Sequence, residues 1–339
     1  MLSMDVMERR PAFRTIDARP TENSIIKPGE LVDVIEMTPL TLADRRIYNQ
    51  LIAHAWERID LAVELVIPKR DLRGSHNVND RVGESIERLM AAIVKVRVVR
   101  DGKAEIERVQ LLGGNVEQER PDGMVRYEFP AKLRRIIKES TIFARLQKEV
   151  MFALSSKYAL ALYEMVQKRG NLTTRCSEEF DLGELRELLG IPKGKLPLWG
   201  NLYQRALEPA MKEVSALSDF EVSIEPLKSG RKVARVRLSW TRKDAEGVGK
   251  VWKELQYSKV GRRARLLGQV EAVELSSARH GALLLQGDTY EEAHRRFPGY
   301  DVYYVEREWQ NWAAGKEPPR HPDRAFLAFF EEYARRHPL

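Results

Sequence analysis

The chain has 339 residues, 43% of them hydrophobic, and its 57 Lys and Arg against 50 Asp and Glu give a formal net charge of +7. This length accommodates two or three domains, each with its own core, and the hydrophobic fraction excludes a chain that is disordered throughout. The single cysteine excludes an internal disulfide framework and a multi-thiolate metal site, and the lack of a long apolar run or apolar leader predicts a cytoplasmic protein with no membrane partner.

The first half of the chain predicts a winged-helix domain that follows a flexible arm. Residues 1–30 are polar, charged and contain three prolines, which is typical of a flexible N-terminal arm. The elements expected after it are a strand over 29–37, a helix from Thr41, a strand and short helix over 65–72, a helix over 78–92, strands over 94–99 and 104–112, a strand over 124–129 and a helix over 131–139. Asp101-Gly102 marks a hairpin turn between two of the strands. We therefore place the first winged-helix domain at residues 31–150.

The second half repeats this order of elements. It predicts a helix over 155–168, a short helix over 180–189, a longer helix over 201–217 and a hairpin with strands over 220–226 and 232–240. Some residues recur as well, such as Ile47-Tyr48 in the first half and Leu162-Tyr163 in the second. The sequence therefore predicts an α+β fold of two tandem winged-helix domains related by a pseudo-repeat, with the second at residues 151–243.

The stretch that follows, residues 244–288, is interpreted as a basic helix and a linker. Between Lys250 and Arg265 it has six basic residues and one acid, and it includes Trp252 and Tyr257. Two interpretations remain open. Either the stretch follows a phosphate backbone with both rings stacked on exposed bases, or it is a solvated helix with a docked tryptophan.

The end of the chain, residues 289–339, predicts a small helical, aromatic-rich domain. From Tyr290 onward it holds eleven of the chain's 27 aromatic residues. The apolar stripe at helical spacing consists of Phe326, Phe329, Phe330 and Tyr333. Side chains three and four residues apart share one face of a helix, so we expect this stripe to form the core of the domain.

Four blocks of the second half resemble the initiator replication protein family of bacterial plasmids, whose members fold as two winged helices. The blocks are LSSKYALALYEMVQKR at 154–169, FDLGELRELLGIPKGKL at 180–196, LYQRALEPAMKEV at 202–214 and SDFEVSIEPLKSGRKVARVRLSW at 218–240. The first half resembles the family more loosely, mainly through TPLTLADRRIYNQLI at 38–52. The order and spacing of four separate blocks make this resemblance specific.

The resemblance implies a protein that binds directly repeated sites (iterons) in the double-stranded DNA of its plasmid's origin. Members of the family open the origin as monomers and repress their own promoter as homodimers, which contact each other through the first domain. The resemblance also implies that the protein acts together with the host DnaA initiator, the replicative helicase and chaperones that convert dimers to monomers.

The second domain carries the clearest candidate DNA contacts. Between Lys193 and Lys243 there are eleven Lys or Arg against five Asp or Glu. The helix over 201–217 buries one stripe, and the residues of the opposite face that suit base edges are Asn201, Gln204, Arg205 and Lys212. The preceding loop and the wing supply cations for backbone phosphates, namely Lys193, Lys195, Lys228, Arg231 and Lys232. Pro209 has no N–H and predicts a kink in the helix.

In the first domain, the face comparable to that helix is less basic. Its candidate DNA contacts are Asn79, Arg81, Ser85 and Arg88. Glu84 and Glu87 lie among them and dilute the positive charge.

An enzymatic site is not expected. Gly249-Lys250 is followed by Val251, so no phosphate-binding loop forms, and the six histidines are scattered along the chain instead of clustered beside a tyrosine. Acid-rich clusters suited to two-metal catalysis are missing too. The sequence therefore predicts a DNA-binding protein without a cofactor, with two open alternatives: a purely transcriptional repressor, or a helicase-loading or primosome protein that acts through its C-terminal domain.

Overall fold

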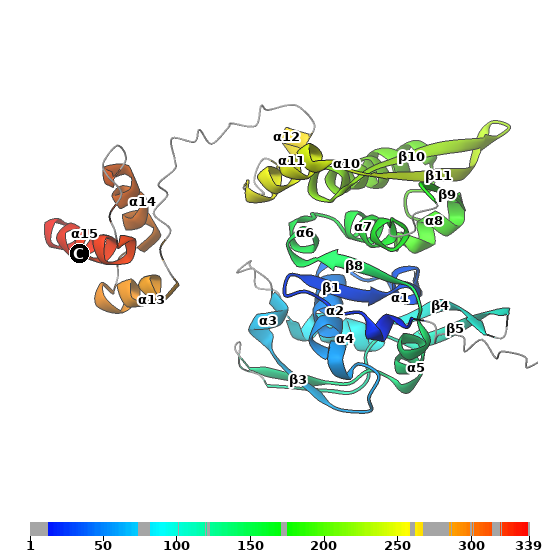
Figure 1. The fold of residues 1–339 in the computed structure, drawn as a ribbon, viewed down its shortest axis with the longest axis horizontal. Helices are drawn as coiled ribbons and strands as arrows, with labels where there is room; N and C mark the ends of the chain where they lie inside the picture. Colours follow the sequence, from blue (N-terminus) through cyan, green and yellow to red (C-terminus); the bar gives the residue numbers. More distant parts are fainter. Residues whose placement is uncertain are drawn as a thin grey trace, which may run out of the picture. The chain divides into compact units, whose positions relative to one another are not determined.

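The computed structural model describes residues 13–73, 82–100, 102–118, 120, 123–170, 175–257, 262–266, 285, 287–298, 300, 302–313, 319 and 321–337. These residues form two compact units, one ending at Leu267 and one beginning at Gly268. In Figure 1 the first unit is coloured from blue to yellow and the second from orange to red.

The first winged-helix domain occupies the N-terminal half of the first unit. Its elements are η1 (Thr15–Asp17), β1 (Ser24–Pro28), α1 (Gly29–Val32), β2 (Ile35–Glu36), α2 (Leu42–Ala55), η2 (Trp56–Arg58), β3 (Leu65–Pro68), α3 (Lys69–Arg73), α4 (Val82–Ala91), β4 (Ile93–Arg100), β5 (Lys103–Gln110), β6 (Asn115–Glu117), β7 (Met124–Tyr127) and α5 (Ala131–Glu139). Helix α2 begins where expected because Thr41 and Asp44 form a capping box, in which each side chain accepts a hydrogen bond from the other residue's backbone N–H. The strand expected over 29–37 is instead the short helix α1 followed by the two-residue strand β2.

The second winged-helix domain follows directly. Its elements are β8 (Phe143–Gln147), α6 (Lys148–Ala153), α7 (Lys157–Arg169), β9 (Ser177–Asp181), α8 (Leu182–Leu188), α9 (Trp199–Leu202), the π-helical turn η3 (Tyr203–Leu207), α10 (Glu208–Leu217), β10 (Phe220–Ser229) and β11 (Lys232–Arg242). The helix expected over 180–189 begins later, because Phe180 pairs with Val236 and so belongs to strand β9. Helix α6 crosses the expected domain boundary between residues 150 and 151.

The two domains share their element order but differ in their sheets. In the second domain, the strand that precedes the short helix joins the hairpin, in the order β10-β11-β9. In the first domain, the corresponding strand β3 pairs with β7 in a separate sheet, β3-β7-β6, and the hairpin β4–β5 pairs with β2 instead. The pseudo-repeat therefore holds for the helices and the hairpin but not for the strand between the helices.

A two-stranded ribbon lies between the cores of the two domains. Strand β1 pairs antiparallel with β8 over its whole length, and all five of its residues are buried. Its neighbouring side chains Ile25 and Ile26 point to opposite faces, so Ile25 joins the core of the second domain and Ile26 that of the first. The prediction of a flexible arm over residues 1–30 is therefore wrong from Thr15 to Glu30, since Thr15 and Ala18 are buried as well and the apolar pair fills both cores; residues 1–12 lie outside the described residues.

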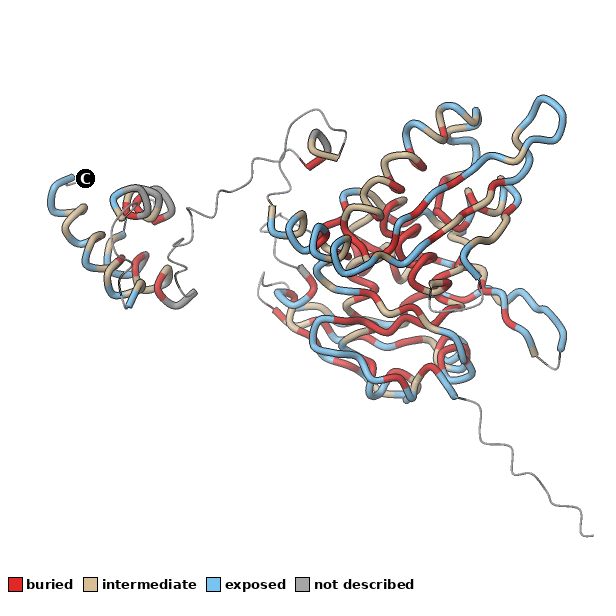
Figure 2. The backbone as a smooth tube through the Cα atoms, turned by 45° about the horizontal axis from the view of Figure 1, so that its top comes forward, coloured by how far each residue is buried: buried red, intermediate tan, exposed pale blue. Residues whose placement is uncertain are grey.

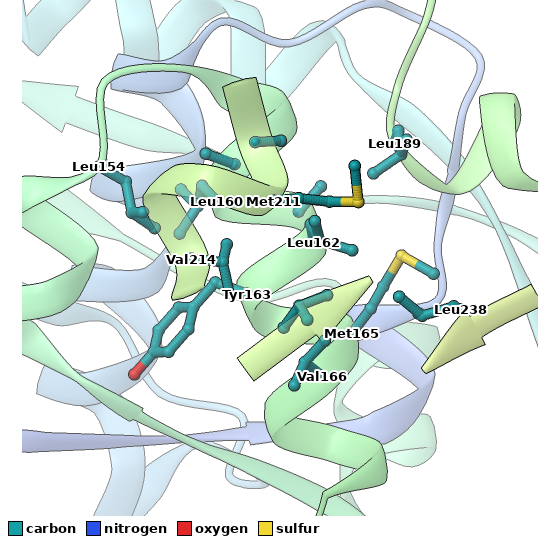
Figure 3. Packing of buried hydrophobic residues seen from close by; sticks show 14 of the residues in the cluster. Leu154, Leu160, Leu162, Tyr163, Met165, Val166, Leu189, Met211, Val214 and Leu238 are labelled. Carbon is teal, nitrogen blue, oxygen red and sulfur yellow. The ribbon is translucent and has the colours of Figure 1, made fainter. Parts of the chain in front are cut away.

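The core of the second domain forms around helix α7. Figure 3 shows Leu160, Leu162 and Met165 of this helix among side chains from the surrounding elements, including Met211 of α10 and Leu238 of β11. Every one of these five side chains is buried. Helix α7 therefore acts as the central element on which the other helices and the sheet of this domain pack.

Polar contacts also tie the two domains together. The Lys27 ammonium of β1 lies 2.8 Å from Oε2 of Glu164 in α7, and Oε1 of Glu164 accepts a 2.7 Å hydrogen bond from the Asn49 amide of α2. The Arg46 guanidinium of α2 donates to the carbonyls of Met151, at 3.3 Å, and of the residues at 152 and 154, which close the C-terminal end of α6. Such carbonyls have no partner within their own helix, so Arg46 satisfies them from the other domain.

Two further helices complete the first unit, α11 (Ala245–Gln256) and α12 (Arg262–Leu266). Helix α11 packs against α10 and α6. The buried Arg262 donates to the carbonyl of Ala153, at 3.1 Å, and to the carboxylate of Glu254, also at 3.1 Å. The basic helix predicted after residue 243 is therefore part of the first unit, and the division between the units, after Leu267, lies within the stretch 244–288 that was predicted as a basic helix and a linker.

The second unit is helical, as the sequence predicts, and consists of α13 (Gly287–Arg296), α14 (Val302–Ala313) and α15 (Pro322–Arg336). The expected aromatic stripe forms its core: Phe326 and Phe330 are fully buried, and Phe330 stacks on Phe297 with ring centroids 4.4 Å apart. Trp309 of α14 contacts Phe326 from the facing helix. Large rings are what such a small core needs, because few side chains are available to fill it.

Candidate nucleic-acid interface

The recognition helix of the second domain runs from Trp199 to Leu217 and comprises α9, η3 and α10. Its buried stripe contains Leu207, Met211 and Val214, which belong to the core of this domain. The apolar spacing in the sequence predicts this stripe, and the buried side chains confirm it. The opposite side of the helix is consequently presented to solvent.

The kink expected at Pro209 takes the form of a π-helical turn. Residues 203–207 are wound more widely than an α-helix, directly before the proline. Pro209 has no N–H to donate to the carbonyl of Arg205, and its ring crowds that carbonyl, so the preceding turn widens to relieve the contact. A π turn holds about one residue more than an α turn, which leaves both Gln204 and Arg205 exposed.

The four residues predicted to read bases differ in availability. Gln204 and Arg205 are exposed, and Asn201 is half-buried. Lys212 lies on the same side, but its ammonium forms an ion pair of 2.9 Å with Glu208, one turn earlier. A partly exposed pair of this kind contributes little free energy, so a DNA phosphate can displace Glu208.

The loop before the recognition helix is held in one conformation. Gly194 and Leu196 both adopt positive φ, at 82° and 50°, and the guanidinium of Arg186 donates to the carbonyls of Lys195 and Leu196. A leucine in the left-handed region is strained, and the hydrogen bonds of Arg186 offset that strain. The loop thereby exposes Lys193 and Lys195, the two cations predicted there.

The wing of the second domain is the tip of the β10–β11 hairpin, residues 228–232. Gly230 takes a φ of 63° at the turn, and all five residues are exposed; Figure 2 shows this hairpin extending away from the buried interior. Among the described residues, no carboxylate lies within 4.0 Å of Lys228, Arg231 or Lys232. Their charges are therefore available to a polyanion.

Two further arginines lie beside the wing and were missed by the sequence interpretation. Arg235 and Arg237 share the solvent face of β11, and both pair with Glu179 of β9, at 2.7 and 2.8 Å. The hydrogen bond from Arg237 holds the pKa of Glu179 below its usual value. The alternating pattern of KVARVRL could have indicated them, since residues two apart in a strand share one face, and Arg235 and Arg237 are two apart.

Two of the four DNA contacts expected in the first domain, Ser85 and Arg88, lie among the described residues. Ser85 is only 2% exposed, and it lies on the buried side of α4. The guanidinium of Arg88 binds both carboxylate oxygens of Asp44, at 2.8 to 3.0 Å. Burial raises the pKa of Asp44, but the hydrogen bond from Arg88 and its other bonds outweigh burial and lower it. The prediction for Ser85 is therefore wrong, whereas that for Arg88, whose side chain is 39% exposed, stays a prediction; Asn79 and Arg81 lie outside the described residues.

Two family models match the winged-helix part of the chain, and the first of them extends through β8 and α6 into α7. The model described as "Initiator Replication protein, WH1" matches residues 24–167, and the model described as "Initiator Rep protein, WH2" matches residues 181–240. The chain belongs to the initiator Rep protein family of plasmid replication initiators. The initiator accordingly contains two winged-helix domains, and the helices after residue 240 lie outside the part that the family models match.

Solved structures resemble the initiator distantly. A crystal structure of Pi initiator protein in complex with iteron DNA is 16% identical, with a TM-score of 0.47, and the match covers 67% of this chain and 100% of that one. A structure of RctB domains 2-3 is 12% identical, with a TM-score of 0.31, and the match covers 68% of this chain and 92% of that one. No curated protein matches the chain.

Neither a metal site nor a membrane-spanning helix is evident in the part of the chain that the structure describes. Among the described residues, no group of His, Cys, Asp or Glu is arranged to hold a metal ion, and no helix is long and apolar enough to span a membrane.

Trp252 of α11 is 55% exposed and lines a cavity of about 670 Å³ between α11, α7 and β8. The tryptophan is thus not docked in a core, and base stacking by its ring stays a prediction.

Proposed function

We propose that this initiator binds directly repeated sites in the double-stranded origin of a plasmid and promotes opening of that origin. The second winged-helix domain supplies most of the binding free energy. The first domain provides the contact for a homodimer that represses the initiator's own gene. Partnership with the host DnaA initiator, replicative helicase and chaperones belongs to the same proposal and rests on the family.

The single observation that carries this proposal is the set of unpaired cations on the second domain. Three successive parts of that domain expose cations that have no carboxylate partner among the described residues: the loop before the recognition helix, the helix itself and the wing. The cations are Lys193, Lys195, Arg205, Lys228, Arg231 and Lys232. In a winged helix, these are the parts that face DNA, so a polyanionic duplex satisfies charges that the protein itself leaves free.

The chemistry of the side chains indicates which residues recognise bases and which bind phosphates. Arg205 and Gln204 project from the front half of the recognition helix, where a guanidinium pairs bidentately with guanine and a carboxamide with adenine. The lysines of the loop and the wing are point charges, which bind phosphates and fix the position of the protein without reading sequence. We therefore assign specificity to the helix and the salt-dependent part of the affinity to the loop and wing.

Competition binding tests the proposal. The purified initiator is titrated with a duplex that carries its plasmid's origin repeats, against random duplex of equal length, over a series of salt concentrations. We expect a preference of about a thousandfold or more that survives physiological salt. Equal affinities for both duplexes that collapse together as salt rises would show a merely electrostatic surface and reject origin recognition.

A second candidate function, recruitment of the helicase, attaches to the C-terminal unit. The observation in its favour is Trp312, which is 55% exposed on α14 although the unit has an aromatic core of its own. A variant that ends at Leu267 keeps α11 and α12, which pack on the first unit. If that variant binds origin repeats normally but no longer recruits helicase, the C-terminal unit is the adaptor; normal recruitment would reject this role.

A further inference from the structure

The recognition helix begins with an apolar side chain that has no place in the core. Leu198 is 66% exposed, whereas Leu202, Leu207 and Leu217 of the same helix are buried. Leu198 is the N-cap residue, with extended backbone angles, and its carbonyl accepts the first hydrogen bond of the helix from the N–H of Leu202, at 3.0 Å. Its position at the front of the helix is thus set by the backbone and not by apolar packing.

The structure around Leu198 keeps it fixed in this exposed position. On its N-terminal side, the hydrogen bond of 2.7 Å from Arg186 to the carbonyl of Leu196 holds the loop. On its C-terminal side, the rings of Trp199 and Tyr203 contact each other, with centroids 5.6 Å apart, and pack against the core. A side chain anchored on both sides presents its methyl groups with little loss of conformational entropy on binding.

Leu198 also lies at the end of the helix assigned to base reading. It directly precedes the first turn, and the N-terminal residues of a recognition helix are the ones that contact base edges in the major groove. In the major groove, the apolar group that a base offers is the C5-methyl of thymine. We infer that Leu198 contacts a thymine methyl group and so determines one position of the recognised sequence; this inference rests on the proposed function.

Its place on the helix, and not its exposure alone, distinguishes Leu198. Isolated exposed leucines are common on protein surfaces. Leu61, in a turn of the first domain, is 48% exposed and lies far along the chain from the recognition helix. It therefore serves as a matched control, because Leu61→Ala removes the same atoms from a similar environment.

The test uses deoxyuridine, which differs from thymidine only by the missing C5-methyl. Binding sites are selected from a duplex pool with a random core, and each thymine of the preferred site is then replaced by uracil in turn. We expect the replacement at one or two positions to weaken wild-type binding about fourfold, as the loss of one buried methyl group predicts. The same replacement should leave the affinity of Leu198→Ala unchanged, while Leu61→Ala should behave as wild type.

The outcomes separate this inference from the proposed function. If no sequence is enriched from the pool, sequence recognition fails altogether, and the role of Leu198 fails with it. If a sequence is enriched but uracil weakens Leu198→Ala as much as wild type, or weakens neither, only the role of Leu198 is rejected. Because Leu198 is exposed, its truncation leaves the core intact, and unchanged circular dichroism of the variant verifies this.

Discussion

The buried ion pair between the two winged-helix domains allows a quantitative prediction. The side chains of Lys27 and Glu164 are only 5% and 1% exposed, and they join β1 to α7. Burial lowers the pKa of Lys27 below its usual 10.5, while Glu164 acts in the opposite direction. In the variant Glu164→Gln, the new carboxamide still accepts from Asn49, but the charge that favours the ammonium is gone. Lys27 must then remain as an unpaired buried cation or lose its proton.

The two possibilities bound the expected loss of stability. Removing one partner of a buried ion pair typically costs about 3–5 kcal/mol. Deprotonating a lysine of pKa 10.5 at pH 7 costs about 5 kcal/mol, which sets the upper limit. We therefore expect Glu164→Gln to lower the free energy of unfolding by about 3 to 5 kcal/mol at pH 7, measured by urea denaturation followed by circular dichroism.

The pH dependence supplies the decisive measurement. If Lys27 is neutral in the folded variant, the unfolded chain binds one more proton below pH 10.5, so the stability of the variant rises with pH. As long as Lys27 stays charged in the folded wild type, the deficit of the variant should shrink by about 1.4 kcal/mol per pH unit.

Two further variants control the interpretation. Adding Lys27→Met to Glu164→Gln should restore most of the lost stability, because no charge is then buried. Glu187→Gln, at an exposed acid of α8, should change stability by no more than about 0.5 kcal/mol. A loss below about 1 kcal/mol for Glu164→Gln at pH 7, or a deficit that grows with pH, would refute a buried Lys27 cation that depends on Glu164.

Three other predictions concern DNA contacts and packing. Arg231→Ala combined with Lys232→Ala should weaken binding to all sequences and reduce the salt slope by about two phosphate contacts; an unchanged slope would place the wing off the DNA. Arg205→Ala should cost about 1–3 kcal/mol for the specific site and relax preference at one or two base pairs, whereas equal weakening on random duplex would make it a phosphate contact. Gly170→Ala places a Cβ 2.2 Å from the ring of Phe220, so it should lower stability by about 1–3 kcal/mol in urea denaturation, and a neutral result would contradict this packing.

The sequence determined much of the second domain because its signals are local. The apolar spacing of the recognition helix, the missing N–H of Pro209 and the turn glycine of the wing each act within a few residues. They predict the helix, its irregularity and its exposed cations from neighbouring residues alone. The exposed cations of the loop and wing follow in the same way, since polar residues at turns remain in solvent.

The tertiary structure decided what depends on partners far along the chain. Strand β1 forms because residues 143–147 supply its hydrogen bonds and two domain cores receive its alternating side chains, none of which is visible within residues 1–30. The guanidinium of Arg88 binds Asp44, which lies 44 residues earlier, and the sequence of the helix face gives no sign of this contact. In the sequence, a basic residue on a helix face looks the same whether or not a carboxylate binds it. Only the fold brings that carboxylate close.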